Sequence, residues 1–222
     1  MLNKRITLFL GHYGSGKTNV AVNYAINLKK QVKAVSIYDL DIVNPYFRTV
    51  DAVNILKDNG VELVVSPYAE TNVDIPAMNS KSYQMVDDLN RYAVVDIGGD
   101  DRGALALGRF SDKIKLENNY EMLLVVNKYR PETRDLDGIL NVKDEIERTA
   151  RINFTGVVNN SNLGNDTTAN TIFDSFSFIN EVSKKTGLPI KFTAVRKDLT
   201  EKVKEKENKI LPIELIKYGD WL

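Results

Sequence analysis

Residues 11–18 read GHYGSGKT and satisfy the pattern G-x-x-x-x-G-K-[ST], directly after the apolar run ITLFL and before an amphipathic stretch. Glycines let the backbone turn and aim N–H groups at phosphate oxygens, and the N-terminus of a following helix adds positive potential there. Lys17 can then reach the β- and γ-phosphates of a nucleoside triphosphate, and the Thr18 hydroxyl can ligate Mg²⁺. We call residues 11–18 the phosphate loop. The residues expected to contact nucleotide here are Gly11, Gly14, Ser15, Gly16, Lys17, Thr18 and Asn19.

Acidic residues follow two other apolar runs, where phosphoryl transfer needs them. Asp96 ends the run AVVD and is expected to organise Mg²⁺ through water, while Gly99 can bring a backbone N–H close to the γ-phosphate. Asp39 and Asp41 follow the run VKAVSIY two residues apart, so in an extended chain they share a face. One division of roles places Asp39 near the metal and lets Asp41 position the attacking water. The alternative for these carboxylates is turn formation or capping.

Short β-branched runs alternate with longer amphipathic stretches, and this alternation predicts the elements that position those residues. The expected strands are 6–11, 32–39, 61–66, 92–99, 121–127, 154–160 and 190–195. The expected helices are 17–30, a run around 47–57, 104–110, 132–149 and 169–186, the last ended by Gly187, with a solvated helix face over 201–209. The pattern predicts an α/β fold: a three-layer, doubly wound, mainly parallel sheet of about seven strands, in one nucleotide-binding domain over residues 1–222.

Composition excludes several classes of function. The 222 residues carry 30 Lys+Arg and 30 Asp+Glu, so bulk charge gives no attraction to nucleic acid or to a membrane surface. Without cysteine and with one histidine, His12, a single chain cannot form disulfides, iron–sulfur clusters or Cys/His zinc sites. The apolar start is far shorter than the roughly 20 residues that span a bilayer, and Pro212 interrupts the last apolar stretch. We expect a cytoplasmic protein with no stable membrane anchor.

Three segments, GHYGSGKT, DLDIVNPYFR and DIGGDDRGALALGR, together resemble the ParA/MinD-type P-loop ATPases of the SIMIBI class. They look like a bacterial group related to the nucleotide-binding domains of cobyrinic acid a,c-diamide synthase, MinD and ParA. The resemblance covers most of the chain and implies Lys17 and Thr18 for phosphate and magnesium, Asp41 for the attacking water and Asp96 for the metal shell. It also implies that Asn160 reads adenine with its amide, for which a turn-forming Asn-Asn pair is the alternative.

His12 departs from that family, whose loop usually carries at this position a signature lysine that reaches the partner's nucleotide across a dimer. A neutral imidazole supplies little charge, which puts the trans-acting mechanism in doubt. Arg48 and Arg102 are candidate replacements, as arginine fingers are elsewhere. His12 as a general base is the less favoured alternative to a side chain that points away from the phosphates.

The choice between adenine and guanine can be weighed from residues 127–130, which read NKYR. Guanine readers often use N-K-x-D after a late strand, where the aspartate accepts from the guanine N–H groups. Arg130 stands at the aspartate position and has no acceptor, so the guanine clamp would fail. We therefore expect ATP with Mg²⁺ as the ligand.

The sequence predicts Mg²⁺-dependent ATP binding and slow hydrolysis that switch a homodimer or a client, which the sequence does not identify. The alternative is an ATP-dependent small-molecule ligase or kinase of the dethiobiotin synthetase type. Its second pocket would use basic and aromatic residues that are otherwise solvated surface: Tyr46, Arg48, Lys128 and Arg130. A nucleotide-sensing module without turnover is a third class. Nucleic-acid binding is disfavoured because no basic patch is evident.

Overall fold

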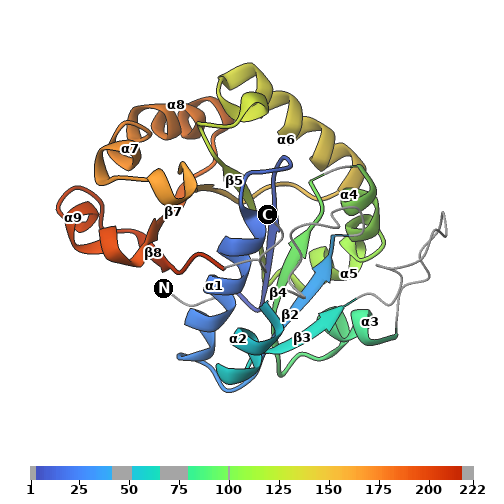
Figure 1. Ribbon diagram of the computed structural model, residues 1–222. Helices are drawn as coiled ribbons and strands as arrows, with labels where there is room; N and C mark the ends of the chain where they lie inside the picture. The colour runs from blue at the N-terminus through green and yellow to red at the C-terminus, as the bar shows by residue number, and fades with distance from the viewer. Residues whose placement is uncertain (1–3, 42–51, 66–79, 100, 217–222) are drawn as a thin grey trace, which may run out of the picture.

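Runs of β-branched and other apolar residues form parallel strands that are covered on both faces. The computed structural model describes residues 4–41, 52–65, 80–99 and 101–216 (Figure 1). In these residues eight strands form one parallel sheet in the order β3-β2-β4-β1-β5-β6-β7-β8. The strands are β1 (Ile6–Leu10), β2 (Val35–Leu40), β3 (Glu62–Val65), β4 (Tyr92–Ile97), β5 (Tyr120–Val126), β6 (Gly156–Asn159), β7 (Ile190–Arg196) and β8 (Ile210–Ile213).

Helices cover the two faces of this sheet. They are α1 (Lys17–Lys29), α2 (Val53–Asp58), α3 (Ser80–Asp87), α4 (Asp101–Gly108), α5 (Ser111–Glu117), α6 (Leu136–Ala150), α7 (Ala169–Phe173), α8 (Phe176–Thr186) and α9 (Thr200–Lys204). Buried side chains of α1 and α2 pack on the face that carries Phe9 and Val94. Buried side chains from α3, α4, α5, α6 and α8 pack on the face that carries Leu8 and Val95. The arrangement has three layers, helices–sheet–helices (Figure 1).

The α/β fold class is confirmed, with differences in detail. The unbroken apolar run of β5 is buried on both faces, since Met122–Val126 are at most 1% exposed. Gly187 ends α8 with a left-handed φ of 71°, as expected of a C-cap. The short helix expected over 104–110 is α4, which begins three residues earlier and ends two residues earlier, and the stretch expected as one helix over 169–186 is divided into α7 and α8.

Three elements were not expected from the sequence: α3, α5 and β8. β8 adds an eighth strand after the charge run, of which only the first part forms a helix, α9. Pro212 lies within β8 without disrupting the sheet, because β8 is the edge strand and pairs only with β7. An edge strand tolerates a residue without an N–H group.

Strands β2, β3 and β4 lie on one side of β1 in the sheet, and the later strands β5 to β8 lie on its other side, so the strand order reverses at β1. In a parallel sheet, such a reversal leaves a crevice at the carboxyl ends of the strands. The phosphate loop follows β1, Asp41 follows β2, and Asn160 follows β6, so all three lie at this edge.

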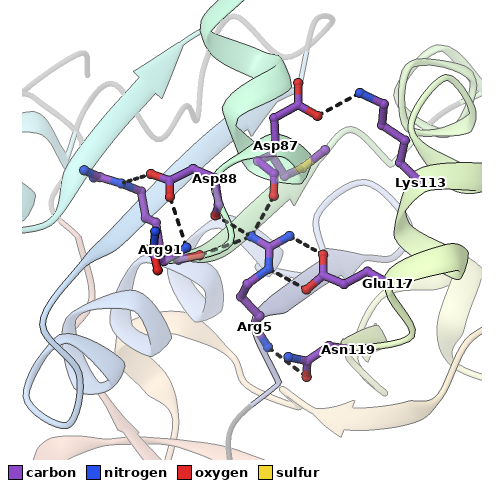
Figure 2. Close-up of polar contacts among 9 residues, drawn as sticks. Arg5, Asp87, Asp88, Arg91, Lys113, Glu117 and Asn119 are labelled. Carbon is purple, nitrogen blue, oxygen red and sulfur yellow. Dashed lines mark hydrogen bonds and ion pairs between the residues drawn. The ribbon is translucent and has the colours of Figure 1, made fainter.

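At the amino ends of the strands, one buried arginine, Arg5, lies immediately before β1 and connects neighbouring elements. Its Nε and Nη2 donate to the two carboxylate oxygens of Glu117 at the end of α5. Its Nη1 donates to the backbone carbonyls of Met85, Asp88 and Arg91, at 3.0, 3.1 and 3.1 Å (Figure 2). One side chain thus joins α5 to the α3–β4 connection.

Candidate functional site

The phosphate loop connects β1 to α1 and presents the start of that helix. Gly16 is the N-cap with φ 81° and ψ 21°, and no side chain among the described residues caps the helix. A Cβ on Gly16 would lie 2.5 Å from Nδ2 of Asn160, so both conformation and space require glycine. Ser15 N–H donates to the His12 carbonyl at 3.1 Å and tightens the turn. The first N–H groups of α1 therefore face the carboxyl edge of the sheet without a side-chain cap.

The acidic residues gather behind the loop on the face covered by α1. Asp39 and Asp96 are register partners on the adjacent strands β2 and β4, so their side chains lie side by side. Asp39 Oδ1 accepts the backbone N–H of Asp41 at 2.9 Å, and Asp41 Oδ2 lies 3.4 Å from Lys17 Nζ. The Lys17 and Asp41 side chains are only 5% and 3% exposed. The structure thus joins Lys17 to Asp41, and the turn that was the alternative for the aspartate pair lies outside the described residues.

Asn160 is joined to the phosphate loop by its side chain. Its Nδ2 donates to the carbonyl of Ser15 at 2.7 Å, and since a carbonyl only accepts, this contact fixes the orientation of the amide. Asn160 Oδ1 and Ser15 Oγ are buried without a hydrogen-bond partner among the described residues. One of the two N–H groups of the amide that was expected to read adenine is therefore engaged by the loop.

A cleft of about 600 Å³ opens between the phosphate loop and the segments that follow β5, β6 and β8. Its described lining residues are Tyr13, Gly14, Gly16, Lys17, Thr18, Asn19, Arg130, Asn160, Asn162, Gly164, Asn165, Ile213, Leu215 and Ile216. Of the residues expected from the sequence, it thus brings together Gly14, Gly16, Lys17, Thr18, Asn19 and Asn160.

The other expected residues lie around this lining rather than in it. A Cβ on Gly99 would lie 2.6 Å from the Gly11 carbonyl oxygen and 2.7 Å from the Tyr13 nitrogen, so Gly99 packs directly on the loop backbone. Gly11 passes close to β5, since a Cβ there would lie 2.5 Å from the Val125 carbonyl oxygen. Asp39, Asp41 and Asp96 do not line the described part of the cleft, although Asp41 contacts Lys17, which does.

The segment after β8 forms an apolar wall of the cleft that sequence reasoning missed. Asn23 exchanges two hydrogen bonds with the backbone of Glu214, both at 2.9 Å. Asn19 Oδ1 accepts the N–H of Ile216 at 3.2 Å, so two asparagines one turn apart on α1 hold this segment. The apolar run LPIELI was visible in the sequence, but it was weighed only as a membrane segment.

The loop of residues 127–135 joins β5 to α6 and reaches the phosphate loop at two points. The side chain of Arg130 lies against Gly14, where a Cβ would be 3.7 Å from its Nε. Glu132 Oε2 lies 3.7 Å from His12 Nδ1, so His12 turns toward this loop. Lys128 instead donates to the carbonyl of Asp174 at 2.8 Å and does not line the cleft.

Burial raises the pKa of the Tyr129 phenol, which donates to the Thr171 carbonyl at 2.7 Å, and nearby Asp174 raises that pKa further. Tyr129 therefore stays neutral and anchors the β5–α6 loop. Of the candidate cations, Arg102 is exposed on α4 and does not line the cleft. Arg48 and Tyr46 lie outside the described residues.

No protein-family model and no curated protein matches the chain. Solved structures do resemble it. Cell division protein FtsY from Thermotoga maritima matches with a TM-score of 0.57 at 18% identity, over 86% of this chain and 61% of that one. The signal recognition particle receptor FtsY from Elizabethkingia anophelis, in complex with GDP, matches with a TM-score of 0.54 at 16% identity, over 88% and 58%.

A nucleotide-binding protein from Archaeoglobus fulgidus, in complex with ADP, matches with a TM-score of 0.51 at 14% identity, over 93% of this chain and 90% of that one. The chain shares the α/β fold of these nucleotide-binding proteins. The chain spans only about three fifths of the length of the FtsY chains, 58% and 61%. At these identities the likeness shows the fold, and it does not single out the ParA/MinD type.

Two absences among the described residues are relevant to the site. None of the helices there is long and apolar enough to cross a membrane. The same residues contain no group of three or more His, Cys, Asp or Glu side chains placed to hold a metal ion. Mg²⁺ usually keeps several waters and binds one or two carboxylates together with substrate phosphates, so Thr18, Asp39 and Asp96 suit a magnesium that arrives with a nucleotide.

Proposed function

We propose that this protein binds MgATP and hydrolyses it slowly. The observation that carries the proposal is a single cleft lined by two unlike sets of residues. The first set is Lys17, Thr18 and the start of α1, which suit phosphates. The second set is the amides that follow β6 and the apolar wall that follows β8, which suit a flat heterocyclic base.

ATP is proposed over GTP because of the residues that line the part of the cleft suited to the base. None of the described residues that line the cleft is acidic, so no carboxylate there accepts from the N1–H and N2–H groups of guanine. Asn160 donates one amino N–H to Ser15, and its Oδ1 acceptor has no hydrogen-bond partner among the described residues. This acceptor suits the amino group of adenine. Arg130 occupies the place of the guanine-reading aspartate and lies against the phosphate loop instead.

In the proposed reaction Lys17 binds the β- and γ-phosphates and moves its charge from Asp41 toward them. Asp41, only 3% exposed and held by Asp39, accepts a proton from the attacking water and orients it. Thr18, Asp39 and Asp96 would hold Mg²⁺, which neutralises charge on the phosphates when bound. Gly99 supports the loop from behind and keeps its N–H groups directed at the nucleotide.

We further propose that nucleotide state controls a homodimer or a client, within one nucleotide-binding domain over residues 1–222. The ligase or kinase alternative loses one of its expected residues, since Lys128 is directed to Asp174 and away from the cleft. Arg130 is the one described member of that set that lines the cleft.

The test combines thermal melting with mass measurement for wild type, Lys17→Ala and Lys128→Ala. At about 100 times its dissociation constant, MgATP should add about 2.7 kcal/mol of stability to wild type and to Lys128→Ala, but not to Lys17→Ala. Dimerisation with a non-hydrolysable ATP analogue, reversed by MgADP, supports the switch. A constant monomer whose turnover rises with one metabolite supports the ligase. Equal stabilisation of Lys17→Ala would refute the assignment of the phosphate loop.

A further inference from the structure

Two cations line the described part of the cleft, and they differ in what holds them. Lys17 is buried and lies 3.4 Å from Asp41. Arg130 comes from the β5–α6 loop, is exposed, and its side chain makes no hydrogen bond or ion pair with any other described residue. Its Nε and Cδ lie 3.7 and 3.8 Å from the point where a Cβ on Gly14 would be. The guanidinium is therefore placed beside the middle of the phosphate loop, and no described residue uses its hydrogen-bonding capacity.

The backbone that carries Arg130 is firmly held. Its N–H donates to the Asn127 carbonyl at 3.1 Å, and its own carbonyl accepts the N–H of Thr133 at 3.1 Å. The hydroxyl of buried Thr133 donates to the Asn127 carbonyl at 2.7 Å. Asn127 Oδ1 accepts the N–H of Tyr129 at 3.0 Å, and Pro131 restricts the residue that precedes it to extended backbone. The arginine thus projects from a rigid turn, so little conformational entropy is lost when it binds.

The acidic residue closest to Arg130 along the loop does not neutralise it. Glu132 is directed to His12, at 3.7 Å. No described residue of the cleft lining carries a negative charge. A cation in a concave site without a protein counter-ion is suited to an anion supplied by the ligand, and a guanidinium matches two phosphate oxygens at once.

We infer that Arg130 is a phosphate-binding residue that contacts the nucleotide across Gly14. It complements Lys17, which belongs to the phosphate loop, from the β5–α6 loop. The inference rests on the proposed function and adds a residue that the phosphate-loop motif does not contain. A charge-assisted contact of this kind should account for about 10- to 100-fold of the affinity for a polyphosphate.

The test compares the binding of ATP and of inorganic tripolyphosphate to wild type, Arg130→Ala, Arg130→Lys and Arg134→Ala. Arg134 is the matched control because it lies on the same loop, 73% exposed, and does not line the cleft. Arg130→Ala should weaken both ligands by the same factor of about 10 to 100, and Arg130→Lys should weaken them less. Arg134→Ala should remain within about twofold of wild type. Without ligand, the melting temperature of every variant should match that of wild type, since these side chains are exposed.

Two results would overturn the inference while leaving the proposed function intact. In the first, Arg130→Ala binds both ligands as well as Arg134→Ala does. In the second, it loses affinity for ATP but not for tripolyphosphate, which would place the contact on the base or ribose. Failure of the proposed function looks different: wild type would bind neither ligand, or Lys17→Ala would bind them as wild type does.

Discussion

Replacing Arg5 by methionine should destabilise the fold by about 3 kcal/mol, because its guanidinium is buried and fully engaged. The Arg5 side chain is 6% exposed and that of Glu117 is 18% exposed (Figure 2). Removing one partner of a buried ion pair costs about 3–5 kcal/mol, and we take the lower end because water can still reach Glu117. The carbonyl of Met85 also loses a buried hydrogen bond. For a chain of 222 residues this loss lowers the melting temperature by about 6–12 °C.

Lys113→Met provides the control in the same region. Lys113 and Asp87 form an ion pair at 2.7 Å, but both side chains are 55% exposed. Solvent screens such a pair, so its loss should cost less than about 0.5 kcal/mol.

The assay is urea unfolding followed by circular dichroism, at low and at high salt. The loss in Arg5→Met should persist at high salt, whereas any loss in Lys113→Met should disappear. Nucleotide affinity should not change, because Arg5 and the phosphate loop lie at opposite ends of β1. This strand of five residues separates them by about 17 Å. If Arg5→Met were no less stable than Lys113→Met, the argument that burial determines the strength of this pair would be refuted.

Two further predictions concern the supports of the cleft. Asn23→Ala removes two hydrogen bonds at 2.9 Å to the segment after β8, so ATP should bind about three- to tenfold more weakly while tripolyphosphate binds unchanged. The control is Asn27→Ala, at an exposed position of α1 one helical turn after Asn23. Equal ATP affinity in the two variants would contradict the proposed role of the apolar wall. Gly99→Ala would place a Cβ 2.6 Å from the backbone of the phosphate loop, so nucleotide affinity should fall more than tenfold. Gly187→Ala, strained at φ 71° but distant in sequence, should lower stability without lowering affinity; equal affinity losses in the two glycine variants would indicate a global effect.

The local features of this protein could be predicted from the sequence, because they depend on neighbouring residues. The spacing of glycines, lysine and threonine over residues 11–18 located the turn between β1 and α1. The unbroken apolar run over 121–127 predicted a strand buried on both faces, as β5 is. Gly187 marked the end of α8 because only glycine adopts a left-handed backbone at no steric cost. The roles assigned to the carboxylates and to Asn160 in hydrolysis and base recognition stay predictions.

Long-range contacts were decided only by the tertiary structure. Asn160 donates to Ser15, 145 residues away, and no pattern in either segment indicates that the amide supports the loop. The sequence left Arg130 as a failed guanine reader, a lining residue of a ligase pocket or a solvated residue, and the turn after β5 places it beside Gly14. The apolar wall after β8 depends on Asn19 and Asn23 of α1, nearly two hundred residues earlier. Sequence periodicity reports which face of an element is buried, whereas the partner of a polar side chain is fixed by how the elements pack together.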